Sequence, residues 1–427
     1  MRSRTLLALA VLLGGLPVLA QQSVQVQPTA ETQPVISAGA AIQGAALWLH
    51  PTDPGNSLIL VPESVNGLFI YRLDGTQRAQ VSQGGALGVD VQENVPVGGI
   101  SQQLVVVASQ TLQSLVAYIV DPTTLELRSA GLANITTQGF NPNSVALYAS
   151  PTSGRVFAFA GGATGTVWQF ELTAQTDGGT TSNLVRTLTV GGPVVGLAVD
   201  DAQSTLYVVQ QNTAIWRYGA EANTGDTRTA VDVVTGGGLS QPLGGVGLYA
   251  PPGDKGYLLA VNGGTSEVRI YDRTPGAHTF RGSFTLAATA SIDAVENPRH
   301  VLVSHRALGT RFPLGMVGVH DGLNAAANEN FKLVPWTTIS APFTPDLLVD
   351  TGAAQPGTDG GTPDAGADGG GGGGTPPIGV PGGPPGSSPD GDDEEESGCG
   401  CSSVSMSGTV LVVLAGVLLL SRRRRWR

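Results

Sequence analysis

Residues 256–273, GYLLAVNGGTSEVRIYDR, carry the pattern that decides the fold. A short apolar run is followed by a polar turn and then by a second run that ends in an aromatic and an acidic residue. Apolar and polar positions alternate with a period of two in such runs, which is the spacing of a β-strand with two different faces. The stretch therefore predicts a β-hairpin.

The same unit occurs at five other places along the chain. These copies lie at residues 57–75, 103–121, 154–172, 204–221 and 299–322, with starts spaced by roughly 45 to 50 residues, the period of propeller blades. Weaker strands between the hairpins, at 85–93, 143–150, 194–200 and 244–250, would complete four-stranded blades. We therefore predict an all-β domain over residues 21–350, folded as a six-bladed β-propeller.

The N-terminus has the form of a secretory signal peptide. Arg2 and Arg4 precede the apolar run LLALAVLLGGLPVLA, and small residues before Gln21 favour cleavage after Ala20. The alternative is an uncleaved membrane anchor, but the run is short for a span and contains Gly14, Gly15 and Pro17. We expect residues 1–20 to be removed and the protein to be exported.

The C-terminal part divides into a linker and a tail. Residues 351–397 are rich in Gly, Pro and Asp, so they cannot bury enough apolar surface to fold, and we expect a disordered linker. Its aspartates lack the spacing and the closing Glu of a calcium loop. Residues 404–420 are apolar enough for a transmembrane helix, and the arginines after them predict that the preceding chain is outside the membrane.

Residues 398–427 as a whole resemble a myxobacterial C-terminal sorting signal of the MYXO-CTERM type. Cys399 and Cys401 come first, then the apolar segment, then the terminal arginine cluster. The resemblance implies a sorting protease that acts at the Cys motif and an anchor at the cell surface or outer membrane. A plain membrane tail is the alternative.

Composition and motifs exclude several classes of function. The formal net charge is −11, so the chain lacks the basic surface that nucleic-acid binding requires. Its only two cysteines, in the tail, leave the domain without disulfides or a thiol nucleophile, and there is no G-x-S-x-G motif. His300 and His305 are five apart on a predicted strand and would face opposite sides, which does not favour a shared metal.

Several long stretches resemble the β-propeller phytases, or 3-phytases. The stretches are AALWLHPTDPGNSLILVPESVNGLFIYRLDG (45–75), VDDAQSTLYVVQQNTAIWRYGAE (199–221), DKGYLLAVNGGTSEVRIYDR (254–273), NFKLVPW (330–336) and DLLVDTG (346–352). The resemblance implies calcium-dependent hydrolysis of phytate, with several calcium ions held by carboxylates at one mouth of the channel and Lys and Arg beside them. Calcium would bridge the substrate phosphates and activate a water.

The residues at the family's site positions depart from that pattern. Positions where the family has carboxylates carry uncharged residues here: Gln43, Gly44, Val195, Gln210, Gln211 and Asn212, with further losses near Pro242, Gly244 and Ala290. The family's paired lysines fall on Ser64 and Val65. Four residues do match family positions and are the calcium or phosphate candidates: Asp90, Tyr148, Asp293 and Asp321. Asp200 and Asp201 are also retained. The other interpretation of the four is a structural role within the blades.

Two functions follow from these residues. The first is a surface-anchored phytase-like propeller with impaired catalysis that acts as a binding module, for which a phosphorylated small molecule is the candidate partner. The second is an active calcium-dependent 3-phytase. The loss of carboxylates favours the first, and the resemblance itself favours the second.

Overall fold

The structure is a computed structural model that describes residues 22–130, 135–136, 142–174, 180–325 and 327–352. The predicted signal peptide, linker, Cys motif and apolar tail lie outside the described residues. Within the described ranges, no helix is long and apolar enough to cross a membrane. Contacts divide the chain into two units, residues 1–356 and 357–427.

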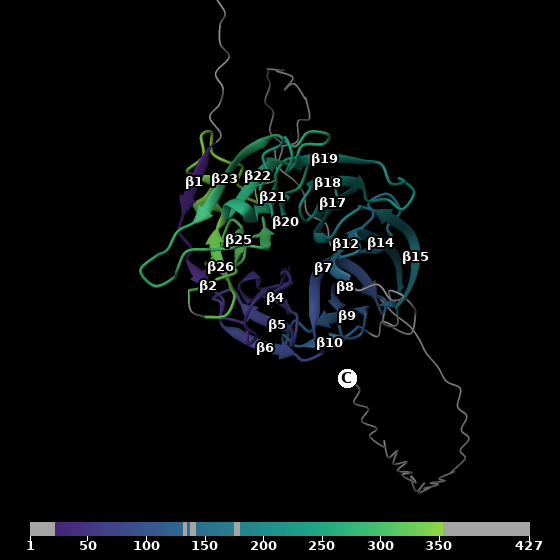
Figure 1. The fold of residues 1–427 in the computed structure, drawn as a ribbon. Helices are drawn as coiled ribbons and strands as arrows, with labels where there is room; N and C mark the ends of the chain where they lie inside the picture. The colour runs from purple at the N-terminus through teal and green to yellow at the C-terminus, as the bar shows by residue number, and fades with distance from the viewer. Residues whose placement is uncertain (1–21, 131–134, 137–141, 175–179, 326, 353–427) are drawn as a thin grey trace, which may run out of the picture. The chain divides into compact units, whose positions relative to one another are not determined.

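The described residues of unit 1 form six sheets, antiparallel except for one strand pair, that succeed one another along the chain and lie around a common centre (Figure 1). Blades 1 to 4 each use consecutive strands. Blade 1 has β3 (Ala46–Trp48), β4 (Leu58–Glu63), β5 (Gly67–Arg72) and β6 (Gln77–Val81); blade 2 has β7 (Ala86–Val97), β8 (Ile100–Ser109), β9 (Ser114–Val120) and β10 (Leu127–Ser129), with β11 (Ile135–Thr136) also paired to β9. Blade 3 has β12 (Pro142–Ala149), β13 (Val156–Gly162), β14 (Thr166–Ala174) and β15 (Thr180–Thr189); blade 4 has β16 (Val194–Asp200), β17 (Thr205–Gln210), β18 (Ala214–Gly219) and β19 (Arg228–Val233).

Blades 5 and 6 each take a strand from the N-terminus. Blade 5 has β20 (Leu243–Tyr249), β21 (Tyr257–Asn262), β22 (Glu267–Asp272) and β23 (Phe280–Leu286), and β1 (Ser23–Val26) pairs in parallel with β23. Blade 6 has β24 (Val301–Ser304), β25 (Met316–Asp321) and β26 (Asn330–Pro335), and β2 (Ala30–Glu31) is its outer strand. The N-terminal strands thus join the last blades to the first and close the ring.

The prediction of a six-bladed all-β propeller is confirmed. Five of the six repeated hairpins supply the second and third strands of a blade, as in β21 and β22, where Leu259 lies opposite Ile270 and Val261 opposite Val268. The sixth, at residues 299–322, supplies the first and second strands of blade 6, β24 and β25. The predicted weaker strands are innermost: β7, β12, β16 and β20. The innermost strands contact one another in the cyclic order β3, β7, β12, β16, β20, β24 and back to β3.

Packing between blades accounts for the strongly apolar second strands. All six residues of β4 and all six of β21 are buried, because each blade is covered on both faces by a neighbour. Each of the six apolar clusters accordingly joins two adjacent blades; one contains Leu259 and Ile270 from blade 5 and Val317 and Val334 from blade 6. Burial of these side chains is the main source of stability in a domain without cysteine.

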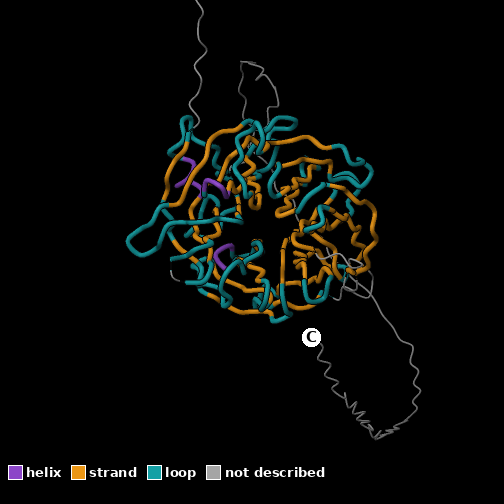
Figure 2. The backbone as a smooth tube through the Cα atoms, viewed as in Figure 1, coloured by secondary structure: helices purple, strands orange, loops and turns teal. Residues whose placement is uncertain are grey.

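Helix is scarce in the described part of the chain. It is confined to the 3-10 segments η1 (Pro54–Asn56) and η2 (Gly263–Thr265) and to α1 (Trp336–Ser340), while loops join the strands (Figure 2). The Trp336 ring stacks on Tyr249 with centroids 4.2 Å apart, and its Nε1 donates to Leu348 O at 2.8 Å. Tyr249 also accepts from Asp350 N at 2.8 Å, so the chain is held against blade 5 as far as residue 350.

Candidate functional site

One end of the central channel opens into a cavity of about 560 Å³, which we call the mouth. It is lined where the innermost strands begin, at Leu87, Val194 and Leu243, and by turns between second and third strands, at Ser64 and Gln211. The opposite end of the channel is lined where the same strands finish, at residues such as Glu93 and Arg306. Strand direction therefore gives each position along an innermost strand a defined depth in the channel.

Five amide side chains from five different blades line the mouth. We call this set the amide ring: Gln43 of blade 1, Gln110 of blade 2, Asn143 of blade 3, Gln211 of blade 4 and Asn297 of blade 6. Each amide carries both a hydrogen-bond donor and an acceptor and no charge. None of the residues that line this cavity is Asp or Glu, and across the described ranges no group of three or more His, Cys, Asp or Glu could hold a metal ion.

At the mouth, blade 5 has the glycines Gly244 and Gly245, whose backbone lies close to Arg299 O, in place of an amide side chain. Gly245 N donates to Arg299 O at 2.7 Å, which draws blade 5 against the loop before β24. A Cβ atom at Gly244 would lie 2.4 Å from the same oxygen. An acidic side chain therefore cannot be accommodated at residue 244 without moving the backbone.

Arg299 is the charged residue of the mouth, and its charge is already balanced. Its Nη2 lies 2.5 Å from Oε1 of Glu329, whose Oε2 accepts from the backbone N–H groups of Ala41 and Ile42, each at 2.9 Å. Although burial opposes its ionisation, the contacts with His320, Ile42 and Arg299 lower the pKa of Glu329. The pair thus presents almost no net charge to the cavity.

His300 lies beside Arg299 and is uncharged near neutral pH. Burial, together with the neighbouring His320 and Arg299, holds the pKa of His300 well below its usual value. The mouth therefore offers neither a negative cluster for cations nor an unpaired positive cluster for phosphate among its described lining residues.

The positions at which we expected lost carboxylates gather at this end of the channel. Gln43, Val195 and Gln211 line the mouth, and Gly44 lines the channel just below it. Gln210 is nearly buried, and its Oε1 accepts from Trp216 Nε1 at 2.9 Å. Asn212 is exposed in the turn between β17 and β18.

Asp90, a retained candidate, lies near the other end of the channel, in β7. Its two carboxylate oxygens accept from Val91 N at 2.9 Å and from Leu147 N at 2.7 Å, and the second bond joins blades 2 and 3. Burial raises the pKa of Asp90 to about 7, with nearby Asp201 acting in the same direction. Asp201 accepts from Gln92 Nε2 at 2.9 Å and from Ala149 N at 3.2 Å.

Tyr148 is fully buried between blades 3 and 4 and does not reach the mouth. Its hydroxyl donates to Glu221 Oε1 at 2.7 Å and lies 2.9 Å from Ser204 Oγ. The other retained aspartate, Asp200, is buried in a two-bonded contact with Arg273, at 2.5 and 2.7 Å. These contacts hold adjacent blades together.

Asp293 and Asp321 are brought together, but around a lysine. The ammonium of Lys332 lies 2.5 Å from Asp293 Oδ1, 3.3 Å from Asp321 Oδ2 and 2.5 Å from Oε2 of Glu31 in the N-terminal strand β2. It also donates to Asn324 Oδ1 at 2.8 Å. We call Glu31, Asp293, Asp321, Asn324 and Lys332 the closure cluster, because it ties the N-terminal strand β2 to the C-terminal strands of blade 6.

The sequence analysis missed three members of these networks. Glu31 and Glu329 were not singled out, and Lys332 entered only as a letter within NFKLVPW. One signal was available for Lys332, since the chain has only one other lysine, Lys255, and an isolated charge in a strand of apolar residues is expected to be paired. Its partners could not be identified from sequence because Glu31 is distant along the chain.

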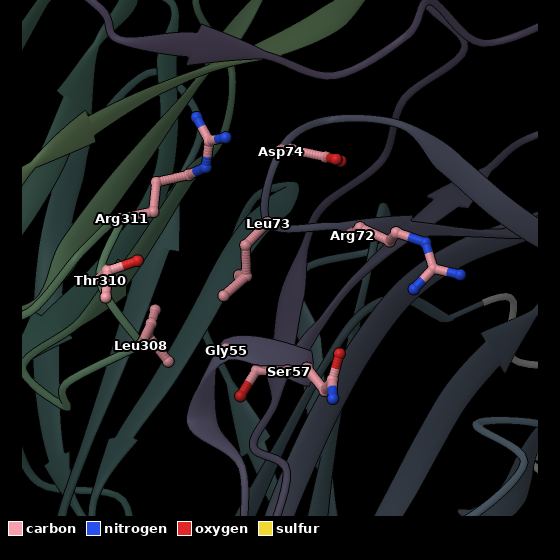
Figure 3. A pocket seen from close by; sticks show the side chains of 9 residues that line it. Gly55, Ser57, Arg72, Leu73, Asp74, Leu308, Thr310 and Arg311 are labelled. Atoms are coloured by element: carbon pink, nitrogen blue, oxygen red, sulfur yellow. The ribbon is translucent and has the colours of Figure 1, made fainter.

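A separate hollow of about 300 Å³ lies between blade 1 and the loop after β24. Figure 3 shows that Arg72 and Arg311 border it with their guanidinium groups extending in different directions. Asp74 lies between them and accepts from the Thr76 hydroxyl at 2.6 Å and from its N–H at 2.9 Å. The two arginines therefore do not form a clamp for a single phosphate or carboxylate.

Comparison with known proteins places this geometry in a family. The family model for phytase matches residues 3–355. A curated 3-phytase of Bacillus subtilis (strain 168) is 29% identical over 327 residues, covering 74% of this chain and 85% of the relative. A crystal structure of BBS1N in complex with ARL6DN, soaked with lead, has a TM-score of 0.43 at 10% identity over 70% of this chain and 80% of that chain, a likeness too weak to compare functions. Since the family model covers most of the chain, including every blade, the protein belongs to the phytase family.

Proposed function

We propose that this phytase-family propeller is a ligand-binding module in which phosphatase catalysis is impaired. The observation that carries the proposal is the composition of the mouth, where amides stand at the channel entrance and no lining residue is acidic. The residues for ligand contact are thus present in a concave site of ordinary small-molecule size. The described residues that line the mouth do not include the carboxylates that calcium chemistry requires.

Calcium is the metal that family membership implies, and the mouth does not fit a multi-calcium centre. Calcium takes six to eight oxygen ligands, and several adjacent dications need carboxylates to balance their charge. Amide oxygens can ligate calcium, but each one removes a full negative charge relative to a carboxylate. The donor set here, Gln43, Gln110, Asn143 and Gln211 with Ser64, supplies oxygen without charge.

Binding of a highly phosphorylated substrate is disfavoured by the same residues. Phosphate recognition depends on charge-assisted hydrogen bonds from Arg or Lys. In the mouth, Arg299 is already paired with Glu329. Ser64 and the exposed Val65 stand where the resemblance places the family's paired lysines. A phytate molecule would therefore bring many negative charges to a site that neutralises very few.

The competing function is an active calcium-dependent 3-phytase, which the family membership and the 3-phytase relative favour. The test is phosphate release from phytate by the full-length protein, measured with calcium and with a chelator. We expect no turnover above background and no increase of the melting temperature with calcium, because bound calcium would stabilise the fold by mass action. Chelator-sensitive turnover would overturn the binding-module proposal.

We also propose that the propeller is displayed outside the cell. The support is the sequence of the two ends: residues 1–20 as a cleaved signal, the Cys motif at Cys399 and Cys401 as the substrate of a sorting protease, and residues 404–420 as a membrane anchor. Protease added to intact cells should release the domain by cutting within residues 351–397. Full protection of the domain in intact cells would contradict surface display.

A further inference from the structure

We infer that the mouth binds a neutral polyhydroxylated ligand, a sugar or polyol that carries no phosphate or carboxylate. The inference rests on the proposed function, because it names the class of ligand for the same site. It follows from three features of the mouth: the state of its amides, its charge and the nature of its walls.

The amide ring has hydrogen-bonding capacity that the fold does not use. Within the described residues, the side-chain amides of Gln110, Asn143 and Gln211 form no hydrogen bond to protein, while Gln43 uses one N–H to reach Ala40 O at 2.9 Å. An amide offers both a donor and an acceptor, and a hydroxyl group is itself both donor and acceptor. Five such groups on five blades suit a ligand with hydroxyls on all sides.

The charge of the mouth selects against ionic ligands. Arg299 is neutralised by Glu329 at 2.5 Å, and His300 is uncharged. A phosphate or carboxylate ligand would lose its hydration without gaining an unpaired cation, which is costly in a partly enclosed site. A neutral ligand exchanges hydrogen bonds with water for hydrogen bonds with amides at little cost.

The walls between the amides are apolar. Leu87, Val194, Val195, Leu243 and Pro298 line the same cavity. Sugar and polyol carbons carry C–H groups that need such surface, whereas a small inorganic anion does not. The alternation of apolar wall and amide therefore matches the alternation of C–H and O–H on the ligand.

The experiment is titration calorimetry of the full-length protein with matched probes. The neutral probes are D-glucose, maltose and D-sorbitol, and the charged ones are glucose 6-phosphate and glucuronate. We expect saturable, calcium-independent binding of at least one neutral probe, and at least about tenfold weaker binding of its charged counterpart, since an unpaired ionic group costs more than one good hydrogen bond. Saturation by no neutral probe, or tighter binding of the charged ones, overturns the inference.

Variants locate the binding. Gln211→Leu combined with Asn143→Leu should weaken binding of the best neutral probe about tenfold or more, because two hydrogen-bonding groups are lost. Gln77→Leu, on the outer strand of blade 1, is the matched control and should leave affinity unchanged. Gln211→Leu alone removes one hydrogen-bonding group and should weaken binding to a smaller extent, which guards against misfolding of the double variant. Unchanged affinity in both mouth variants overturns the inference.

The outcomes distinguish a failure of the ligand class from a failure of the proposed function. Absence of sugar binding together with absence of phytate turnover would reject the ligand class and leave the impaired phosphatase intact. Calcium-dependent phytate turnover would reject the impaired phosphatase, whatever the sugars do.

Discussion

The mouth contains positions where the sequence predicted that family carboxylates are replaced, the closure cluster contains two where it predicted that they are kept, and the two regions differ in where the charges are. In the closure cluster the carboxylates of Glu31, Asp293 and Asp321 surround Lys332. In the mouth five of the polar side chains are amides, and no described lining residue is acidic. The difference teaches that the acidic residues of the closure cluster are engaged by the fold, while the described lining of the mouth carries no carboxylate.

The largest effect is expected from Lys332→Met. Methionine retains the length and apolar stem of the fully buried lysine but leaves three carboxylates without their cation. Removing one partner of a buried ion pair typically costs about 3–5 kcal/mol, and we expect a loss in this range in the free energy of unfolding by urea. Lys255→Met, at the exposed and only other lysine, should change stability by less than about 0.5 kcal/mol.

The pH dependence of the same variant separates charge from packing. Although burial opposes its charge, the contacts with Asp293 and Glu31 raise the pKa of Lys332, so its contribution to stability is full below the unfolded pKa of about 10 and is lost as pH rises through the folded pKa. The deficit of Lys332→Met in urea unfolding should therefore be constant below about pH 9 and shrink at higher pH. A deficit independent of pH would mean that the cluster contributes packing and not charge.

Asp90 extends the comparison to the far end of the channel. Its folded pKa of about 7 lies above the unfolded value, so its contribution to stability falls as pH rises from about 4 to about 7 and is constant beyond. Asp90→Asn should flatten the dependence of the melting temperature on pH over this interval. A variant that keeps the wild-type slope would assign the slope to another group.

The sequence predicted the blades because their determinants are local. The strands β21 and β22 are joined by a short turn, so the pattern at residues 256–273 contains both partners of the pairing. The strands β1 and β2 escaped prediction because four and two residues carry too little periodicity, and their partners lie in the last blades. Their pairing is a property of ring closure.

The site was predictable to the extent that it follows from strand order. Gln43 and Gln211 lie at the mouth, as positions aligned with the family's site should. The sequence could not show that Lys332 would meet Glu31, or that Glu329 would engage Arg299, because these contacts join elements from opposite ends of the chain or from separate turns. Nor could it show that Gly244 lies against Arg299 O and has no space for a side chain.

A third change tests whether the mouth can be returned to the acidic state. Gln210→Glu, Gln211→Glu and Asn212→Asp together place three negative charges at the turn between β17 and β18. We expect calcium to raise the stability of this variant by about 1.4 kcal/mol once calcium exceeds its dissociation constant tenfold, measured as a melting-temperature shift. The control places acidic residues on outer strands, Gln77→Glu, Thr187→Glu and Thr229→Glu, and should show no shift. Equal responses would indicate nonspecific charge screening.

The smallest change in the free energy of unfolding is expected when residues of the amide ring are replaced. This result would contrast most strongly with that of Lys332→Met. Gln211→Leu and Asn143→Leu remove side chains that make no hydrogen bond within the described protein, so no buried partner is left unsatisfied. The free energy of unfolding should change by less than about 0.5 kcal/mol in urea denaturation. A loss of 2 kcal/mol or more would show that the mouth amides hold the blades together, as the closure cluster does. Retained stability with lost ligand affinity would instead separate the two regions, since the mouth would then serve binding alone.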